Sequence, residues 1–328
     1  MSNLQVLITD RAWENYDIEQ EVLNAIGATI IDSPTGDEET LVKLARNVDA
    51  IASCWALTTA AVIKAAPRCK IISRYGIGLD NIDISAATQQ GMIVTNVPDY
   101  CTEEVADHTI AQLLGLSRNI AIYNAEMKQG IYDRNHAPVM HRLSEQRVGI
   151  IGFGAIARSV YRKLLPFGCN IVASTLSQNN HGTDCQMLPL DELIQTSDYV
   201  MLLVPLTKST HHLINSETLS QMKEGAFLIN TSRGGLVDYD AVWDALQKNK
   251  LTGAAFDVFT PEPPDLSHPL FKDNRVIISP HAAFLTVEST NDLRKRSMQH
   301  IVDFFQGRRP PHIVNPEVLE RSDAIALS

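Results

Sequence analysis

Short apolar runs alternate with segments of helical periodicity along most of the chain. Within the first hundred residues, five runs rich in apolar and β-branched residues are predicted as strands, at 5–9, 28–31, 50–53, 71–73 and 92–95. Helical patterns separate these strands, at 17–26, 38–46, 59–65 and 84–90. Apolar strands joined by short helices are typical of βαβ units, so this part of the chain predicts a parallel sheet.

The same alternation restarts near residue 147. It predicts strands at 147–151, 170–174, 199–204, 226–230, 252–257 and 275–279, with helices at 155–165, 190–195, 217–222 and 240–247. Polar stretches at 133–145 and 177–184 are expected to be loops. Two successive patterns of this kind predict an α/β protein with two doubly wound parallel-sheet domains.

Two longer helices, predicted at 103–130 and 287–306, bracket the second pattern. The first repeats apolar residues at a spacing that suits a core-facing helix, and the second ends at Gly307 before two prolines. The pattern leaves two interpretations open. Both can be ordinary packed helices, or they can mark crossings between two domains, with the C-terminal helix returning to the first domain.

Composition and charge narrow the classes of function. The 328 residues carry 28 Lys+Arg against 38 Asp+Glu, a net charge of −10, and 45% are hydrophobic. This acidic balance argues against nucleic acid and anionic membrane surfaces as partners, and the apolar runs are too short to span a bilayer. Five scattered cysteines and a start without a basic, then apolar, segment predict a reduced, cytoplasmic protein without a secretory signal.

A glycine motif follows the predicted strand at 147–151. The sequence Gly152-Phe153-Gly154-Ala155-Ile156-Ala157 has the form GxGxxA and opens a predicted helix. Gly152 permits a tight turn, Gly154 lets the backbone approach a pyrophosphate, and Ala157 allows close helix packing. A helix N-terminus offers free N–H groups to phosphates, so the motif predicts a dinucleotide site.

The residue that normally selects the dinucleotide is missing. An acid that binds the ribose 2′-hydroxyl is expected at the end of the next strand, where Thr175 stands instead. Asp184 is the next acid, beyond a loop, and residues 170–180 contain no arginine to favour a 2′-phosphate. The sequence therefore leaves NAD and NADP open as cofactors.

Three later strands are each followed by an ionisable residue: Arg233, Glu262 and His281. Ligands of an open α/β sheet bind beyond the carboxyl ends of its strands, so these three residues are expected near the cofactor. Arginine can bind a carboxylate with two parallel hydrogen bonds, and a histidine beside a glutamate is favoured in its protonated form. This set suits the reduction of a 2-keto acid, with the histidine donating a proton.

A metal site is not expected. The only adjacent histidines are His211 and His212. Their side chains would point apart on a strand or helix, and a surface loop is the preferred interpretation. No cluster of metal ligands is visible in the sequence, which argues against a metal-dependent hydrolase.

The sequence resembles the D-isomer-specific 2-hydroxyacid dehydrogenase family. The matching stretches are 74–83 (RYGIGLDNID), 95–108, 148–157, 212–214, 225–238 (GAFLINTSRGGLVD), 253–263 (GAAFDVFTPEP) and 280–284 (PHAAF). The sequences of these motifs are most similar to those of the C-terminal binding proteins, and they are also similar to those of the phosphoglycerate dehydrogenases.

The resemblance implies a role for each matching residue. Arg233, Glu262 and His281 would be catalytic, with His281 as the acid and base. Substrate-binding residues would be Tyr75, Gly76, Ile77, Gly78, Arg233 and Phe284, with the N–H groups of Ile77 and Gly78 binding the carboxylate. Cofactor-binding residues would be Gly152, Gly154, Ala155, Ile156, Thr175, Val204, Pro205, Thr210, Thr231, Ser232, Arg233, Asp257 and His281, with Asp257 facing the nicotinamide carboxamide.

The family's organisation implies domain crossings at the long helices. A flavodoxin-like substrate domain would comprise 1–101 and 289–328, and a Rossmann domain 102–288. Relatives pair through the segment at 106–147, so a homodimer is expected. The expected partner is a small 2-keto or 2-hydroxy acid, with no nucleic acid and no membrane.

Two departures from the family pattern affect these expectations. Thr175 replaces the usual acid, and Phe284 stands where C-terminal binding proteins carry tryptophan. The leading hypothesis is therefore an NAD(P)-dependent D-2-hydroxyacid dehydrogenase of unidentified substrate. A cofactor-gated, corepressor-like binding protein is the alternative.

Overall fold

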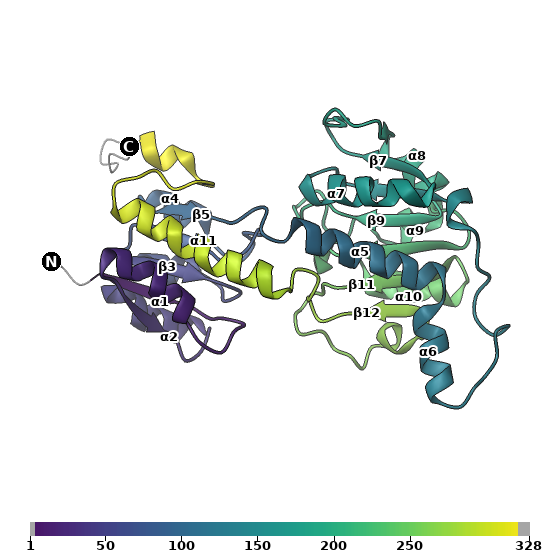
Figure 1. Ribbon diagram of the computed structural model, residues 1–328, viewed down its shortest axis with the longest axis horizontal. Coiled ribbons are helices and arrows are strands. Elements are labelled where there is room, and N and C mark those ends of the chain that lie inside the picture. Colours follow the sequence, from purple (N-terminus) through teal and green to yellow (C-terminus); the bar gives the residue numbers. More distant parts are fainter. Residues whose placement is uncertain (1–3, 321–328) are drawn as a thin grey trace. The chain divides into compact units, whose positions relative to one another are not determined.

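The computed structural model describes residues 4–320, which form two compact units (Figure 1). One unit contains the chain up to Tyr100 together with the chain from Thr286 onward, and the other runs from Cys101 to Leu285. The helix predicted at 287–306 thus falls in the same unit as the first hundred residues. The predicted domain boundaries lie within one to three residues of these limits, since 101 compares with 100 and 289 with 286.

The first unit is built on a five-stranded parallel sheet with the order β2-β1-β3-β4-β5. Its strands are β1 (Gln5–Ile8), β2 (Thr29–Asp32), β3 (Ala50–Ser53), β4 (Ile71–Arg74) and β5 (Ile93–Thr95). Its helices are α1 (Asp17–Leu23), α2 (Glu38–Leu44), α3 (Ala60–Lys64), α4 (Ile84–Gln89) and α11 (Val287–Phe305). This strand order is that of flavodoxin-like folds.

Side chains of the first sheet alternate between two buried layers. Val6 and Ile8 of β1 pack into the core under α1 and α11, whereas Leu7 packs into the core under α2, α3 and α4. A sheet covered on both faces needs apolar residues at every strand position, which explains the continuous apolar runs in the sequence. A buried ion pair also joins α11 to α1, with 2.6 Å between Arg294 Nη2 and Glu19 Oε2.

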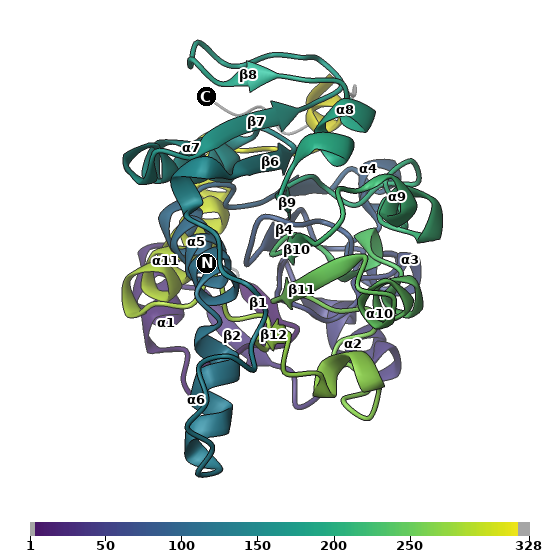
Figure 2. The same ribbon diagram turned by 90° about the vertical axis from the view of Figure 1, so that its right-hand side faces the viewer.

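The second unit is built on a seven-stranded parallel sheet with the order β12-β11-β10-β9-β6-β7-β8, which Figure 2 shows from β8 at the top to β12 below. Its strands are β6 (Arg147–Ile151), β7 (Asn170–Ser174), β8 (Gln186–Met187), β9 (Tyr199–Leu202), β10 (Ala226–Asn230), β11 (Leu251–Phe256) and β12 (Val276–Ile278). Its helices are α5 (Thr102–Ser117), α6 (Ile120–Lys128), α7 (Ala155–Leu164), α8 (Leu190–Thr196), α9 (Ser216–Gln221) and α10 (Tyr239–Gln247). On one side of β6 lie β7 and β8, and on the other side lie β9 to β12, so the strand order reverses at β6. In doubly wound folds this switch point is where ligands bind.

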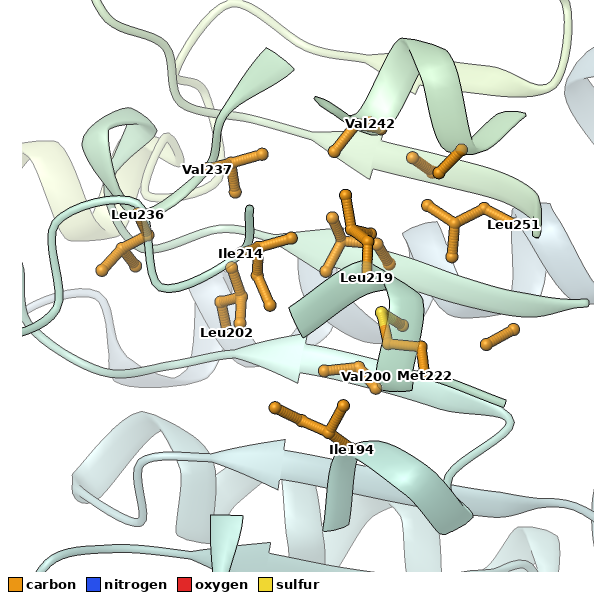
Figure 3. Close-up of a cluster of buried hydrophobic side chains, with 14 of the residues drawn as sticks. Ile194, Val200, Leu202, Ile214, Leu219, Met222, Leu236, Val237, Val242 and Leu251 are labelled. Carbon is orange, nitrogen blue, oxygen red and sulfur yellow. The ribbon is translucent and has the colours of Figure 1, made fainter. Parts of the chain in front are cut away.

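The second sheet also separates two cores. Val200 and Leu202 of β9 point toward α8, α9 and α10, a layer that Figure 3 shows in close-up. Tyr199 and Met201 of the same strand point to the opposite layer, under α5 and α7. The sheet is therefore held from both sides, and its strand ends form a fixed edge.

The predicted helix at 103–130 is wrong in one respect, because it is two helices. Asn119 adopts a left-handed conformation, with φ of 52°, between α5 and α6. Its side-chain amide donates to the carbonyl of Pro138, 2.7 Å away, which ties the break to the following loop. Asparagine adopts this conformation more readily than most other residues. The short strand β8 was not predicted, and no helix among residues 4–320 is long and apolar enough to cross a membrane.

Candidate active site

The glycine motif lies at the switch point, between β6 and α7. Gly152 has a φ of +92°, and a Cβ there would lie 2.4 Å from the carbonyl oxygen of Leu203. Only glycine fits this position, because a side chain would collide with the neighbouring strand's backbone. A Cβ on Gly154, in contrast, would project into open space.

The N-terminus of α7 provides donors at this open position. Gly154 is its N-cap, and among the described residues no side chain caps the helix or places an acid in its first turn. The N–H groups of this turn and the partial positive charge of the helix are therefore available to an anion. The cradle fits a pyrophosphate, with Ala155 and Ile156 in the first turn.

The other expected cofactor-binding residues follow neighbouring strands at the same edge. Val204, Pro205 and Thr210 lie in the loop after β9, and Thr231 and Ser232 lie in the loop after β10. The loops are tied together, since Ser232 Oγ donates to the carbonyl of Val204 at 2.6 Å. Thr210 Oγ1 donates to the carbonyl of Pro205 at 2.8 Å.

Thr175 lies immediately after β7, next to the glycine motif's strand. Its hydroxyl is 3.4 Å from that of Ser177, and the following Leu176 is fully exposed. Asp184 is exposed and lies further along, before β8. The position that normally carries a ribose-binding acid therefore presents hydroxyl groups.

His281 and Glu262 form a pair at the carboxyl end of the sheet. His281 Nδ1 lies 2.8 Å from Glu262 Oε2, and both side chains are about one-third exposed, at 31% and 35%. The other carboxylate oxygen of Glu262 accepts the N–H of Phe259 at 2.8 Å. Burial would raise the pKa of Glu262, but the hydrogen bond and charge of His281 outweigh it and lower this pKa below its usual value. Because Nδ1 is engaged by Glu262, Nε2 is the ring nitrogen that can exchange a proton with a ligand.

A tight turn holds His281 in place. The backbone of His281 has a φ of +50°, which is uncommon for a residue other than glycine. Its N–H donates to the carbonyl of Asp257 at 2.7 Å. The fully buried carboxylate of Asp257 accepts the N–H groups of Ala282 and Ala283, both at 2.9 Å. Asp257 therefore fixes the turn, a role that the sequence did not indicate.

Arg233 follows β10 and lies close to the Glu262 segment. The backbones of the two segments touch, because a Cβ on Gly234 would lie 2.1 Å from the carbonyl carbon of Phe259. Asn230 Nδ2 donates to the carbonyl of Arg233 at 2.9 Å, and the charge of Arg233 helps to lower the pKa of Glu262. The structure thus brings Arg233, Glu262 and His281 together at one edge of the sheet.

Phe284 provides an apolar surface beside His281. The two rings meet edge to face, with centroids 6.0 Å apart and an interplanar angle of 84°. This contact places an aromatic side chain beside the imidazole ring of His281.

In the first unit, the loop after β4 presents backbone donors. Three carbonyls of this loop accept hydrogen bonds from the protein. The carbonyl of Gly76 accepts the N–H of Val97 at 3.0 Å, and the carbonyl of Ile77 accepts from Asn96 Nδ2 at 2.8 Å. The carbonyl of Gly78 accepts from Arg74 Nε at 3.0 Å. Among the described residues, the N–H groups of Ile77 and Gly78 form no hydrogen bond, so they are available to an anion.

Tyr75 was expected to bind substrate, but its side chain belongs to the core. It is 2% exposed, its ring packs edge-on against Trp13 at 5.0 Å, and its hydroxyl lies 3.7 Å from Met298 Sδ. Burial raises the pKa of Tyr75 well above its usual value. Only its main chain can reach a ligand.

His211 and His212 lie between β9 and α9. Both lie in an exposed turn as predicted, and their rings stack, with centroids 4.1 Å apart. His212 has a φ of 47°, so the usual alternation of neighbouring side chains does not apply. Within residues 4–320, no three His, Cys, Asp or Glu side chains are grouped to hold a metal ion.

The amino-acid sequence is similar to those of known dehydrogenases and reductases. Residues 110–283 match the family model described as D-isomer specific 2-hydroxyacid dehydrogenase, NAD binding domain. The chain is 37% identical to a glyoxylate reductase of Thermofilum pendens, over 80% of this chain and 79% of that protein.

Solved structures agree with this similarity. The D-lactate dehydrogenase of Aquifex aeolicus, complexed with NAD and lactic acid, has a TM-score of 0.84 and 28% identity, covering 92% of this chain and 96% of that one. The NADPH-dependent glyoxylate/hydroxypyruvate reductase of Sinorhizobium meliloti, in complex with NADP and malonate, has a TM-score of 0.85 and 28% identity. That match covers 95% of this chain and 97% of the other.

Proposed function

Because this chain belongs to the D-isomer-specific 2-hydroxyacid dehydrogenase family, an NAD(P)-dependent enzyme class that interconverts 2-keto and 2-hydroxy acids, we propose that Arg233, Glu262 and His281 carry out this reaction here. The observation that carries the proposal is the 2.8 Å pair of His281 and Glu262. It lies on the same sheet edge as the glycine cradle at 152–157.

Each residue has a separate task in this proposal. Nε2 of His281 donates a proton to the keto oxygen as it becomes a hydroxyl, and accepts it in the reverse direction. Glu262 keeps the ring oriented and balances its positive charge. The guanidinium of Arg233 binds the substrate carboxylate.

The cofactor would be held by the cradle and the adjoining loops. Gly152, Gly154 and the first turn of α7 suit its pyrophosphate, and Thr175 would face the adenosine ribose. When bound, the nicotinamide supplies or removes the hydride. The buried Asp257, together with the turn that it fixes, would orient the carboxamide of the nicotinamide. We propose the unit from Cys101 to Leu285 as the dinucleotide-binding domain and the other unit as the substrate domain.

We propose a small 2-keto acid as the substrate, with glyoxylate the first to try because the similar Thermofilum pendens protein is named a glyoxylate reductase. The test is oxidation of NADH and of NADPH with glyoxylate, pyruvate, hydroxypyruvate and 4-methylthio-2-oxobutyrate. Reduction of at least one acid is expected. Silence across the panel, with a folded protein that binds the cofactor, would favour the corepressor-like alternative instead.

The pH dependence of reduction should change in Glu262→Gln. The contact with His281 lowers the pKa of Glu262, so an ionised carboxylate lies beside the ring that is proposed to donate the proton. Reduction needs a proton on that ring, so its rate falls as pH rises. Removing the carboxylate should move this fall to lower pH, by about one unit. A pH series of kcat/KM measures the effect, and an unchanged profile would show that Glu262 and His281 do not act together.

Dual cofactor use is expected because no acid at Thr175 repels a 2′-phosphate. The ratio of kcat/KM with NADH and NADPH should lie within about a hundredfold. Thr175→Asp should shift preference toward NADH by like-charge repulsion of the phosphate. Ser85→Asp, an equal charge added to an exposed position of the first unit, should leave the ratio unchanged. If the wild-type protein already rejects NADPH by more than about a thousandfold, Thr175 is not in the ribose pocket.

We also propose that the protein is a cytoplasmic homodimer. Six large apolar side chains are exposed on α6 and the segment after it: Ile120, Met127, Ile131, Tyr132, Val139 and Met140, with Tyr132 91% exposed. Next to them, a cavity of about 420 Å³ is lined by residues that include Leu114, Leu143 and Phe167. Apolar patches of this kind often mark interfaces, and twofold pairing is the commonest symmetry.

All five cysteines are free thiols, in keeping with a reducing compartment.

Analytical ultracentrifugation tests the pairing directly. The wild-type protein should sediment as a dimer at micromolar concentration, and Tyr132→Glu together with Met127→Lys should shift it toward monomer. A wild-type protein that sediments only as a monomer would contradict the proposal.

A further inference from the structure

The hydroxyl of Ser279 is the centre of a hydrogen-bond network outside the proposed catalytic set. Ser279 Oγ lies 2.6 Å from Asp257 Oδ1 and 2.8 Å from His108 Nε2. Gln112 Nε2, one turn further along α5, lies 3.4 Å from the same oxygen. The network joins helix α5 to the turn that carries His281.

The direction of these bonds follows from the number of protons. An ionised carboxylate only accepts hydrogen bonds, so the single proton of Ser279 points to Asp257. Ser279 Oγ is then an acceptor for His108, which carries a proton on Nε2. Gln112 Nε2 lies 3.3 Å from His108 Nε2 and 3.4 Å from Ser279 Oγ, so in this arrangement it donates to Ser279 and not to the protonated ring nitrogen. His108 Nε2 is also 3.6 Å from Asp257 Oδ1, so a polarised N–H faces a fully buried carboxylate.

The buried carboxylate is the part of the network that acts on the site. Asp257 has no exposed surface, and a buried carboxylate is costly unless donors surround it. The donor chain from His108 through Ser279 supports one side of Asp257. The oxygen that accepts from Ser279, Oδ1 of Asp257, also accepts the N–H of Ala282, and Oδ2 accepts the N–H of Ala283; these two N–H groups belong to the turn at His281, whose backbone is left-handed.

We propose that His108 is a positioning residue of the reaction: through Ser279 it holds Asp257, and through Asp257 it holds the turn that presents His281. The proposal rests on the function proposed above for His281. In this proposal, helix α5 helps to position His281 for proton transfer. His108 acts through Ser279 and Asp257, and not by direct contact with the pair of His281 and Glu262.

Amide hydrogen exchange of the cofactor-free protein tests the network without any turnover. In His108→Leu the N–H groups of Ala282 and Ala283 should exchange at least about tenfold faster than in the wild type, while core strands such as β9 are unchanged. His108→Gln keeps a donor of similar reach and should restore slow exchange. His141→Leu, which removes a histidine from an exposed loop, is the matched control and should have no effect.

Kinetics and a double-mutant cycle test the link to the reaction. His108→Leu should lower kcat by about tenfold with little change in KM for the cofactor, and His108→Gln should recover most of the rate. Ser279→Ala should have a similar effect, and the double variant should be no worse than either single one, because both break the same chain.

Two results would overturn the proposal: additive losses in the cycle, or wild-type exchange at Ala282 and Ala283 in His108→Leu. Failure of the proposed function would be recognised separately, because the wild-type protein would reduce no 2-keto acid while the exchange response persisted.

Discussion

Replacing His281 by alanine should lower kcat/KM for 2-keto acid reduction by about a hundredfold to ten-thousandfold, the range that a general acid supplies. The loss follows from the geometry, since Glu262 engages Nδ1 and Nε2 is the donor for the keto oxygen. Cofactor affinity should stay within a few-fold of the wild type, because the cradle at Gly152 and Gly154 does not depend on this ring. Steady-state kinetics and fluorescence titration with NADH measure the two quantities.

The left-handed backbone at His281 calls for a second variant. Alanine tolerates a φ of +50° poorly, so His281→Ala alone could change the turn as well as the chemistry. Asparagine accepts this conformation and lacks the titratable ring, so His281→Asn should lose as much activity as His281→Ala. Recovery of near wild-type reduction in His281→Asn would show that the ring is not the proton donor.

Much of the fold was predictable because it depends on short-range patterns. The strands predicted at 147–151 and 170–174 have the bounds of β6 and β7, since a sheet buried on both faces produces uninterrupted apolar runs. The glycine motif was recognisable for a similar reason. Gly152 is required by a collision with the backbone of Leu203, and such a requirement leaves a residue-specific mark in the sequence.

The errors concern features that tertiary contacts decide. The break at Asn119 is stabilised by the carbonyl of Pro138, a partner 19 residues away that helical periodicity does not reveal. The burial of the Tyr75 side chain under Trp13 and Met298 is likewise set by tertiary contacts, and its place among the substrate-binding residues stays a prediction. β8 has only two residues, too few to form a recognisable pattern.

The candidate site was only partly predictable for the same reason. Arg233, Glu262 and His281 could be expected together, because the carboxyl ends of parallel strands meet at one edge. His108 and Ser279 could not, since one is on a helix and the other precedes the PHAAF motif, 171 residues further along the chain. Their hydrogen bond becomes visible only when α5 is packed on the sheet.

Arg233 should be the second position where a substitution has a large effect. A bidentate, charge-assisted contact with a carboxylate is worth about 2–4 kcal/mol of transition-state binding, so Arg233→Ala should lower kcat/KM by about 30-fold to 1,000-fold. Arg233→Lys keeps the charge but not the planar fork, and its loss should be smaller yet still severe. The Glu262 segment packs against this loop, so both variants need a melting curve to show that they remain folded.

The comparison between the two variants is the informative measurement. If the fork binds the substrate carboxylate, guanidinium ion added to Arg233→Ala should restore part of the rate, whereas ammonium should restore less. The exposed Arg309, changed to alanine, provides a control that should respond to neither ion. Wild-type kinetics in Arg233→Lys would mean that planar recognition of the carboxylate is not used. In that case, the loss of kcat/KM in Arg233→Ala would come from removing a positive charge that helps to lower the pKa of Glu262. The variant would then show a changed pH profile of reduction.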